Sequence, residues 1–354
     1  MGFVPDYHHI VDAASNIPAK RVPTYEHLID LRIMEDVLGV RFREAKNGSL
    51  EDKRFYFKNY CEFQRRAGYD AVSFEDCIGD VMPGMGSLYK HKEPEIRNRA
   101  DFERYDWTAA EKEYKKRFYT DYEILREVMP EGMKAIGGPG NGIFECIQEI
   151  AGYENLCYIK YDDPELYADL FRAVGNTNYN VWKGFIENFS DVFCVMRFGD
   201  DLGYKCNTMI SAEDIRRHVV PQYKRIVDMV HAAGKKFLCH SCGAIMSVME
   251  DMIGTVGIDA KHSNEDQIAP YRFWVETYGD RIGNFGGIDT DIVCRGSEAD
   301  VRKAVEDVFD VIDGHGGAAV GTGNSIPSYI TTERYLIFNK AIREVRGEKN
   351  VCYV

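Results

Sequence analysis

The sequence predicts an α/β protein with the (β/α)8 architecture, the TIM barrel. Three observations predict it: eight short apolar runs rich in β-forming residues, helix-length segments between successive runs, and a length of 354 residues without a Pro- or Ser-rich linker. Eight parallel strands are the number that closes such a barrel. The runs span residues 22–25, 70–75, 134–139, 192–199, 236–242, 258–263, 282–287 and 318–323.

The segment 211–234 shows how the intervening helices are encoded. It opens with a capping-box-like pair, Ser211 and Asp214, and it ends at Gly234. Pro221 lacks a backbone N–H and its ring clashes with the preceding turn. We therefore expect a kink at this position or a break of the helix in two.

The N-terminal third of the barrel is predicted to be elaborated. Residues 76–133, between the second and third runs, form a connection much longer than the about 2–6 residues usual in α/β units. Because they follow the carboxyl end of a strand, we expect an insertion that covers the barrel mouth, either as an active-site lid or as a surface excursion on the rim. Nothing marks a domain boundary, so residues 1–354 are interpreted as a single domain.

The charge balance excludes two classes of partner. Lys and Arg number 44 and Asp and Glu number 57, so the formal net charge is −13. Such a protein repels phosphate backbones and anionic lipid surfaces, and we expect no nucleic-acid or membrane role. No run reaches the roughly 18 apolar residues of a membrane helix, and the N-terminus shows no signal pattern. We expect a cytoplasmic protein with mostly reduced cysteines.

The sharpest chemical signal is the motif Cys239-His240-Ser241-Cys242-Gly243, at the end of the fifth run. Side chains at positions i and i+2 of a strand share a face, so His240 and Cys242 point together while Cys239 and Ser241 point the other way. Imidazole and thiolate are both zinc ligands, and Gly243 permits a sharp turn. A redox dithiol and ordinary buried strand residues are the alternatives.

Polar residues gather at the predicted carboxyl ends of the strands, where barrel enzymes carry their catalytic groups. They are Glu26, His27, Glu75, Glu145, Asp200, Asp201, His262, Glu265, Asn284 and Asn324. His262 and Glu265, next to the motif, are candidates for a third metal ligand. Asp200 or Asp201 is a candidate acid/base group or a partner that orients His240. Ordinary alternatives are a turn cap for Asp200-Asp201 and donation to a backbone carbonyl for His262.

Together with the motif, these residues indicate that the chain resembles the uroporphyrinogen decarboxylase superfamily, whose fold is a (β/α)8 barrel. The resemblance is carried by residues 199–245 (GDDLGYKCNTMISAEDIRRHVVPQYKRIVDMVHAAGKKFLCHSCGAI), 282–297 and 316–345. His-x-Cys-Gly at 240–243 is similar to the zinc-dependent corrinoid methyltransferase branch. That branch moves methyl groups between a corrinoid (cobalamin) protein and a thiol or a methylated substrate.

Two positions depart from the pattern of the superfamily. True decarboxylases carry an Arg-rich segment after the first strand, which grips the substrate carboxylates, whereas this chain has Glu26 there. Methyltransferases that act on coenzyme thiols use a Cys in the last strand's loop as the third zinc ligand, and this chain has Asn324. Either Glu265 supplies the missing ligand, as similarity to the cobalamin-independent methionine synthases implies, or the metal is absent altogether.

The resemblance implies a zinc-dependent methyltransferase. Zinc held by one Cys, one His and a carboxylate is a stronger Lewis acid than zinc held by two thiolates, which favours O-demethylation. The expected reaction moves a methyl group between a small O-methyl substrate and the corrinoid of a partner protein. His240, Cys242 and Glu265 are the implied ligands of Zn²⁺, and Asp201 or Glu145 is the implied catalytic acid/base group. Substrate binding is assigned to Glu26, His27, Glu75, Asp200, Asn284 and Asn324.

Two other functions remain open. A metal-free lyase acting on a carboxylated ring would need cationic side chains at the barrel mouth, and few Lys or Arg lie near the predicted strand ends. A non-catalytic barrel that binds a ligand or a corrinoid protein is the other alternative, with Asn324 as the mark of a lost metal site.

Overall fold

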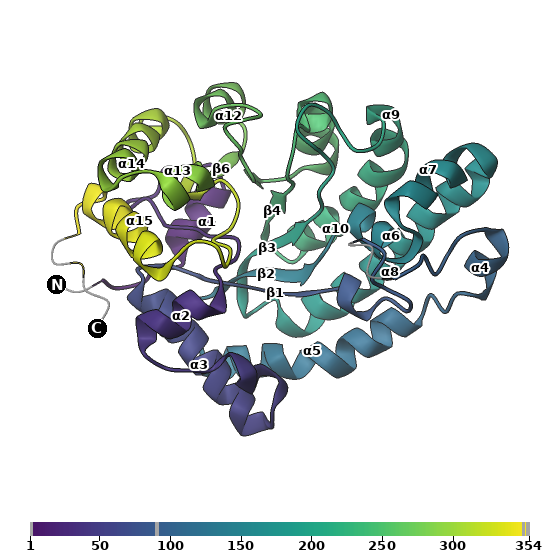
Figure 1. The fold of residues 1–354 in the computed structure, drawn as a ribbon, viewed down its shortest axis with the longest axis horizontal. Helices are drawn as coiled ribbons and strands as arrows, with labels where there is room; N and C mark the ends of the chain where they lie inside the picture. The colour runs from purple at the N-terminus through teal and green to yellow at the C-terminus, as the bar shows by residue number, and fades with distance from the viewer. Residues whose placement is uncertain (1–2, 89–91, 349–350, 352–354) are drawn as a thin grey trace.

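The centre of the molecule is a parallel β-sheet in the computed structural model, which describes residues 3–88, 92–348 and 351 (Figure 1). Its seven strands lie side by side in chain order, and each pairs in parallel with the next. They are β1 (Val72–Cys77), β2 (Ala135–Gly140), β3 (Phe193–Gly199), β4 (Lys236–His240), β5 (Ala260–His262), β6 (Gly283–Ile288) and β7 (Ala318–Thr322). Their carboxyl ends therefore gather at one edge, where folds of this type carry functional groups.

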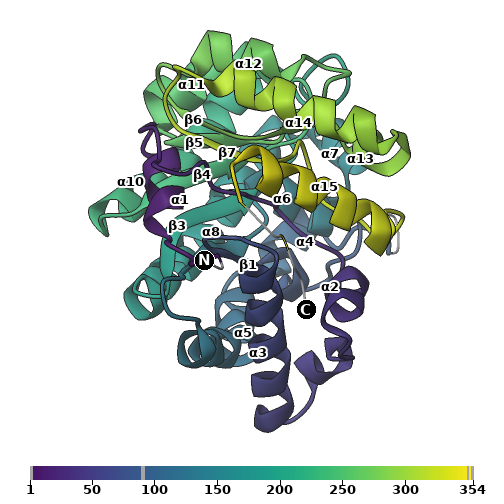
Figure 2. The same ribbon diagram turned by 90° about the vertical axis from the view of Figure 1, so that its left-hand side faces the viewer.

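Helices surround the strands in two perpendicular views (Figure 1, Figure 2). The longer ones are α1 (His8–Ala14), α2 (Leu31–Leu38), α3 (Leu50–Arg66), α4 (Arg99–Arg104), α5 (Ala109–Val128), α6 (Ile143–Ala151), α7 (Tyr153–Asp162), α8 (Pro164–Phe189), α10 (Val220–Ala232), α12 (Tyr271–Tyr278), α13 (Thr290–Arg295), α14 (Glu298–Ile312) and α15 (Thr332–Val345). Short turns are η1 (Arg43–Asn47), η2 (Gly79–Val81), α9 (Ala212–Asp214), η3 (Ile215–Val219), η4 (Met246–Val248), α11 (Met249–Asp251) and η5 (Met252–Val256). No helix in these described ranges is both long enough and apolar enough to cross a bilayer.

Seven of the eight predicted runs coincide with strands, and the first does not. Residues 22–25 make a single parallel bridge, between Thr24 and Val320 of β7. The Tyr25 N–H donates to Val320 O at 3.0 Å, and the Val320 N–H donates to Pro23 O at 2.9 Å. Pro23 has no N–H with which to continue a ladder. The count of eight strands is not confirmed, and the fold is a TIM-like sheet of seven parallel strands.

The side chains inside the barrel change from apolar to polar along the strands. Near the amino ends they are apolar, and α1 packs against them through Ile10, Ala13 and Ala14. The other members of this inner core are Tyr25, Ala71, Ile136, Cys194, Val195, Leu238, Ala260, Phe285 and Ala319. On the inward face of β4, the next side chain after Leu238 is that of His240, two residues further along. The fold therefore places its polar groups towards the carboxyl ends.

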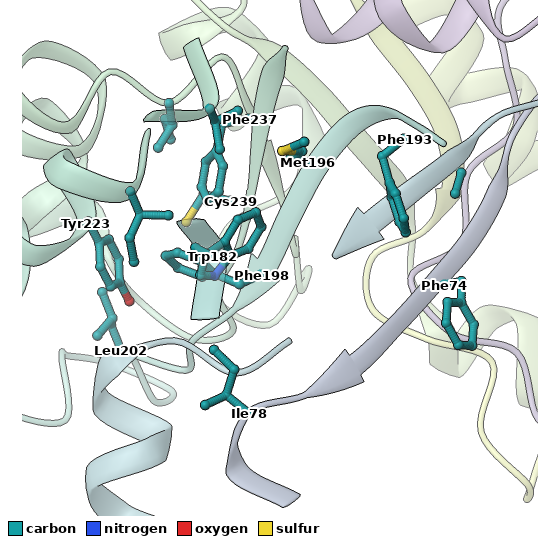
Figure 3. Close-up of a cluster of buried hydrophobic side chains, with 14 of the residues drawn as sticks. Phe74, Ile78, Trp182, Phe193, Met196, Phe198, Leu202, Tyr223, Phe237 and Cys239 are labelled. Carbon is teal, nitrogen blue, oxygen red and sulfur yellow. The ribbon is translucent and has the colours of Figure 1, made fainter. Parts of the chain in front are cut away.

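A second, larger core fills the space between the strands and the helices. Phe198 of β3 and Cys239 of β4 lie in it with Trp182 of α8 and Tyr223 of α10 (Figure 3). The Phe198 ring contacts the Tyr223 ring edge to face, with centroids 4.8 Å apart. Because Cys239 is buried on this outer side, the next residue, His240, faces the barrel interior.

The helix predicted over 211–234 contains a π-helical turn just before its proline. Ser211 Oγ accepts the Asp214 N–H at 3.1 Å and begins α9. A π-helical turn, η3, then separates α9 from α10, and Pro221 lies in the first turn of α10. The missing proline N–H removes one α-helical hydrogen bond, which accounts for the π-helical turn. The chain stays helical from α9 through η3 into α10, so the helix is irregular next to Pro221 but is not broken in two.

The connection from β1 to β2, predicted as an insertion over 76–133, has two parts. Helix α5 lies between α3 and α8 on the outside of the sheet, the usual place of a crossover helix (Figure 1). The stretch before it lies beside α6, because the Gly86 N–H donates to Glu149 Oε2 at 2.7 Å and the Ile96 N–H donates to Ile150 O at 3.0 Å. Residues 89–91 of the predicted insertion lie outside the described residues. Coverage of the mouth and the single-domain interpretation remain predictions.

A buried carboxylate holds the loop after α2. Glu35 Oε1 accepts the backbone N–H groups of Phe42 and Arg43 at 2.7 and 2.8 Å, and Oε2 accepts the Arg43 side chain at 2.8 Å. Burial alone would raise the pKa of Glu35, but the hydrogen bonds from Arg43 and Phe42 lower it to about 2. The charged form therefore stabilises the fold above about pH 4.5, and this contribution is lost as the pH falls towards 2.

We predict that Glu35→Gln lowers the free energy of unfolding at pH 7 by about 2 kcal/mol, the size expected for hydrogen bonds to a charged group. Urea unfolding at several pH values between 7 and 3 measures this difference. The gap from wild type should narrow below about pH 4.5, and a gap independent of pH would contradict the assignment. Asp36→Asn, at the neighbouring and more exposed carboxylate, should change stability by less than about 1 kcal/mol.

Candidate metal centre

Two functional side chains lie together at the end of β4. The strand ends at His240, and Cys242 follows with its Sγ 3.5 Å from His240 Nε2. Cys239 is buried in the outer core, and Ser241 Oγ accepts the Leu202 N–H at 3.2 Å. The prediction that His240 and Cys242 point together is confirmed.

Close backbone contact holds the loop that carries Cys242. Gly243 has a φ of +82°, and a Cβ at this position would lie 2.1 Å from the carbonyl carbon of Gly203. The Ala244 N–H donates to Tyr204 O at 2.7 Å. Only glycine tolerates both the dihedral angle and the contact, which confirms the predicted sharp turn. The loop after β4 is thereby fixed against the loop after β3.

Asp201, in the loop after β3, points to the same place. Its Oδ1 accepts the Cys242 N–H at 3.0 Å. Asp201, His240 and Cys242 each offer one ligand atom, and these atoms all lie within 4.8 Å of one another. A carboxylate oxygen, an imidazole nitrogen and a sulfur form a donor set that suits zinc, with three protein ligands and one open position.

Glu265, the predicted third ligand, belongs to neither group of metal-ligand atoms found in the described part of the chain. It is half-buried in the segment after β5. Burial, and then the charge of Asp201, raises the pKa of the Cys242 thiol, with a smaller contribution from Glu265. The geometry therefore favours Asp201 over Glu265 beside His240 and Cys242.

Three buried histidines, His27, His240 and His262, form the second group of possible ligands. The rings of His27 and His240 stack, with centroids 3.9 Å apart and 18° between their planes. An imidazole lone pair lies in the ring plane, so two stacked rings cannot both direct a lone pair at one ion. Burial lowers the pKa of all three, to about 3 for His262, and they are neutral. We interpret this group as packed neutral imidazoles.

His240 and Cys242 are each held by a neighbour from another strand. His240 Nδ1 lies 2.8 Å from His262 Nδ1, and His262 Nε2 lies 3.0 Å from Thr322 O at the end of β7. Asn324 Nδ2 donates to Cys242 Sγ at 3.3 Å. Asn324 therefore lies beside the sulfur. Its predicted role in substrate binding remains a prediction.

Glu145, in the first turn of α6, lies next to Asp201. Its Oε1 accepts the Asp201 N–H at 3.3 Å, and its Oε2 accepts Asn141 Nδ2 at 2.7 Å. Burial, followed by repulsion from Asp200 and Asp201, raises the pKa of Glu145 well above its usual value. The raised pKa favours the protonated form of Glu145, the form required of a general acid.

Asp200 is fully buried, and its contacts hold helix α6. Its two oxygens accept the backbone N–H groups of Phe144 and Glu145 at 2.9 and 2.8 Å, and the Tyr223 hydroxyl also donates to it. The N-cap residue of α6, Gly142, has no side chain to accept these N–H groups, so Asp200 supplies the acceptor. These contacts indicate that Asp200 positions Glu145, and they do not indicate the predicted contact with substrate.

A buried ion pair lies closer to the amino ends of the strands than His240, at the level of the preceding inward residue, Leu238. Arg197 of β3 donates to Glu75 Oε2 at 2.8 and 3.2 Å and to the hydroxyls of Tyr25 and Ser73 at 2.8 and 2.9 Å. Glu75 Oε1 lies 3.6 Å from His27 Nε2. Glu75 and His27, both predicted to bind substrate, thus belong to a buried polar layer. The predicted catalytic, metal and substrate roles of the strand-end residues remain proposals.

Glu26 is a further predicted substrate-binding residue, and it contacts the end of β7. Its carboxylate accepts the Thr322 N–H at 2.8 Å and the Thr322 hydroxyl. Burial raises the pKa of Glu26 to about 8, although the Thr322 hydrogen bonds act in the opposite direction. Glu26 therefore holds Thr322 in place.

Asn284 lies away from the other predicted residues. It is the second residue of β6 and pairs with Ala318, the first residue of β7. Its Nδ2 donates to Ile282 O at 3.1 Å. Because β6 continues to Ile288, Asn284 lies near the amino end of the strand, and the prediction that it stands at the carboxyl end was wrong.

Sequence reasoning missed Arg197 entirely. The available signal was a charged residue inside the apolar run 192–199, since a charge in a buried parallel strand needs a partner. The alternative considered for His262, donation to a backbone carbonyl, is confirmed by its contact with Thr322. The acceptor belongs to the main chain, so no side-chain pattern could have identified it.

The fold and the site define a TIM-like α/β protein with a His/Cys/carboxylate group at the carboxyl ends of its strands. The family model for uroporphyrinogen decarboxylase (URO-D) matches residues 44–345, so the chain belongs to this family. No curated protein matches the chain. The superfamily expected from the motifs is confirmed.

The solved structures similar over nearly the whole chain include a methyltransferase and a putative methionine synthase. A methyltransferase from Methanosarcina mazei has a TM-score of 0.71 and 14% sequence identity, covering 95% of this chain and 98% of that one. A putative vitamin-B12 independent methionine synthase from Listeria monocytogenes has a TM-score of 0.51 and 13% identity, covering 98% of this chain and 100% of that one. At these identities the similarity shows the fold.

We predict that Glu75→Gln lowers the free energy of unfolding by about 3–5 kcal/mol, because it leaves the Arg197 charge buried without a counter-ion. The double variant Glu75→Gln/Arg197→Met removes that charge and should lose less stability than the single variant. Urea unfolding of wild type, both single variants and the double variant completes the cycle. A double variant no more stable than Glu75→Gln would contradict this assignment of the pair.

Proposed function

We propose that this protein is a zinc-dependent methyltransferase that moves a methyl group between an O-methyl substrate and the corrinoid of a partner protein. The observation that carries the proposal is the group formed by Asp201, His240 and Cys242, whose ligand atoms lie within 4.8 Å of one another at the carboxyl ends of β3 and β4. Membership of the URO-D family and the fold similarity to a methyltransferase support it.

The residues present suit zinc. His240 and Cys242 supply a nitrogen and a sulfur, and Asp201 supplies the carboxylate oxygen that completes three protein ligands. We place Asp201 in the role that the sequence assigned to Glu265. When bound there, zinc would act as a Lewis acid on the ether oxygen of the substrate.

The remaining polar groups have separate tasks in this proposal. Glu145, whose raised pKa favours the protonated form, lies next to Asp201 and would donate a proton to the oxygen that loses its methyl group. Asp200 keeps Glu145 in position through the start of α6. His27 Nδ1 is buried and has no hydrogen-bond partner within the described residues, so it is available to a polar atom of the substrate.

The lyase alternative has less support. A carboxylated ring would need a cation free to receive it, but Arg197, the buried cation of the barrel interior, is already neutralised by Glu75. Lys261 is also buried: it donates to Ser263 O, and its Nζ makes a cation–π contact with the Trp274 ring, 4.1 Å from the ring centroid. The non-catalytic alternative predicts no turnover with any methylated compound.

We predict about one zinc per chain in the purified protein. Metal analysis should show the zinc lost in His240→Ala and Cys242→Ala and bound at least about tenfold more weakly in Asp201→Asn. Glu265→Gln and Cys157→Ala, a thiol outside both ligand groups, should retain it. If Glu265→Gln loses zinc and Asp201→Asn retains it, the third zinc ligand is Glu265 and not Asp201. Wild type without zinc after reconstitution under reducing conditions would overturn the metal proposal.

We predict methyl transfer from methoxylated aromatic compounds to a corrinoid protein in its Co(I) state, followed by the methyl-cobalt absorbance and by the demethylated product. Glu145→Gln keeps the shape of the side chain but cannot donate the proton, so kcat should fall about 100-fold or more while zinc content is unchanged. Release of carbon dioxide from carboxylated rings without methyl transfer would favour the lyase.

A further inference from the structure

The hydrogen bonds around His240 form a chain with a single direction. A backbone carbonyl can only accept a hydrogen bond, so His262 Nε2, 3.0 Å from Thr322 O, carries a hydrogen. His262 is fully buried, and its ring nitrogens contact only Thr322 O and His240 Nδ1 within the described residues. A hydrogen on Nδ1 as well would make the ring a buried cation without a carboxylate partner, so Nδ1 is an acceptor. The same neutral ring is thus a donor at one nitrogen and an acceptor at the other.

The state of His262 determines the state of His240. Their Nδ1 atoms lie 2.8 Å apart, so His240 Nδ1 must donate the hydrogen that His262 Nδ1 cannot. A neutral His240 then has its lone pair on Nε2. That atom lies 3.5 Å from Cys242 Sγ, in the group that Asp201 completes.

We propose that His262 is a positioning residue that selects the tautomer of His240, so that Nε2 is presented to the metal as a lone pair. The proposal rests on the proposed function for the identity of the metal, but the tautomer is a property of the metal-free chain. A ligating histidine commonly donates its other N–H to a fixed acceptor. Here that acceptor is a second histidine, which is in turn anchored on the main chain.

The surroundings keep this chain of hydrogen bonds in place. Glu26 accepts the Thr322 N–H and hydroxyl, which holds the end of β7 whose carbonyl receives the His262 hydrogen. Gly286 leaves the room that is needed, because a Cβ there would lie 2.8 Å from Thr322 O and 3.1 Å from His262 Cδ2. The register of β4 and β5 places His240 directly opposite His262.

Two other rings touch the histidine pair without a hydrogen bond to it. His27 stacks on His240, and the Tyr25 ring meets His262 edge to face with centroids 5.1 Å apart. These contacts fill space but supply neither a donor nor an acceptor to the ring nitrogens. Tyr25→Phe is therefore a matched control that alters the same buried layer and leaves the chain of hydrogen bonds intact.

The first test is the tautomer of His240 in the metal-free protein. Long-range ¹H–¹⁵N spectra of histidine-labelled protein report which ring nitrogen is protonated, and His240→Ala and His262→Ala assign the signals. We expect a hydrogen on Nδ1 of His240 and on Nε2 of His262. A hydrogen on Nε2 of His240 in wild type would overturn the proposal, whether or not the protein binds zinc.

The second test is zinc affinity, measured by competition with a chromophoric chelator. His262→Phe keeps a ring of similar shape but has no acceptor, and zinc affinity should fall about 10- to 100-fold, the range seen when such partners of ligating histidines are removed. His262→Asn places an amide oxygen near the position of Nδ1, and affinity should return to within about threefold of wild type. Tyr25→Phe should bind zinc as wild type does.

The outcomes separate this proposal from the proposed function. Wild-type affinity in His262→Phe, or a loss in His262→Asn as large as in His262→Phe, would overturn the role of His262 while leaving the zinc site standing. Wild type that binds no zinc would overturn the proposed function. The tautomer spectra would still test the direction of the hydrogen bonds from His240 to His262 and from His262 to Thr322 O. If His262→Phe does not fold, the spectra of wild type and of His262→Asn test the role of His262. Nδ1 of His240 should be protonated in both proteins, and the absence of that proton in either would overturn the proposal.

Discussion

The backbone register of β3, β4 and β5 is the constraint on which the site depends. Gly199 pairs with His240 and His240 pairs with His262, so three neighbouring strands end at one level. A slip of one residue would turn His240 outwards and bring Cys239 into the barrel, because successive side chains alternate between faces. The outer core opposes such a slip, since Phe198 and Cys239 are buried on that side.

Within that register, the cost of burying polar groups determines the interior. Arg197 needs Glu75, and His262 needs both an acceptor for one nitrogen and a donor for the other. Arg197, His262 and their partners lie on five separate strands, β1, β3, β4, β5 and β7. The residues that hold the fold together near the carboxyl ends of the strands are therefore also those that orient the site. We expect changes to the His240–His262 pair to alter stability and metal binding together.

The third metal ligand depends on loop geometry. Glu265 and Asp201 both follow a strand that adjoins β4, and the sequence offers each as a carboxylate close to the motif. Past the end of a strand the alternation of faces no longer applies, so side-chain direction depends on tertiary contacts. The close approach of Gly203 to Gly243 brings the loop of Asp201 onto the loop of Cys242, and the Cys242 N–H then orients the carboxylate.

The sequence by itself determined the parallel α/β class, seven of the strands, the irregularity of the helix at Pro221 and the shared direction of His240 and Cys242. Each follows from local rules: strand periodicity, the missing proline N–H and the conformational freedom of Gly243. Only the tertiary structure showed that residues 22–25 make a single bridge, that Asn284 lies near the amino end of β6, and that Asp200 holds α6. These outcomes depend on which backbone groups meet across distant parts of the chain, and contacts of that kind leave no local pattern in the sequence.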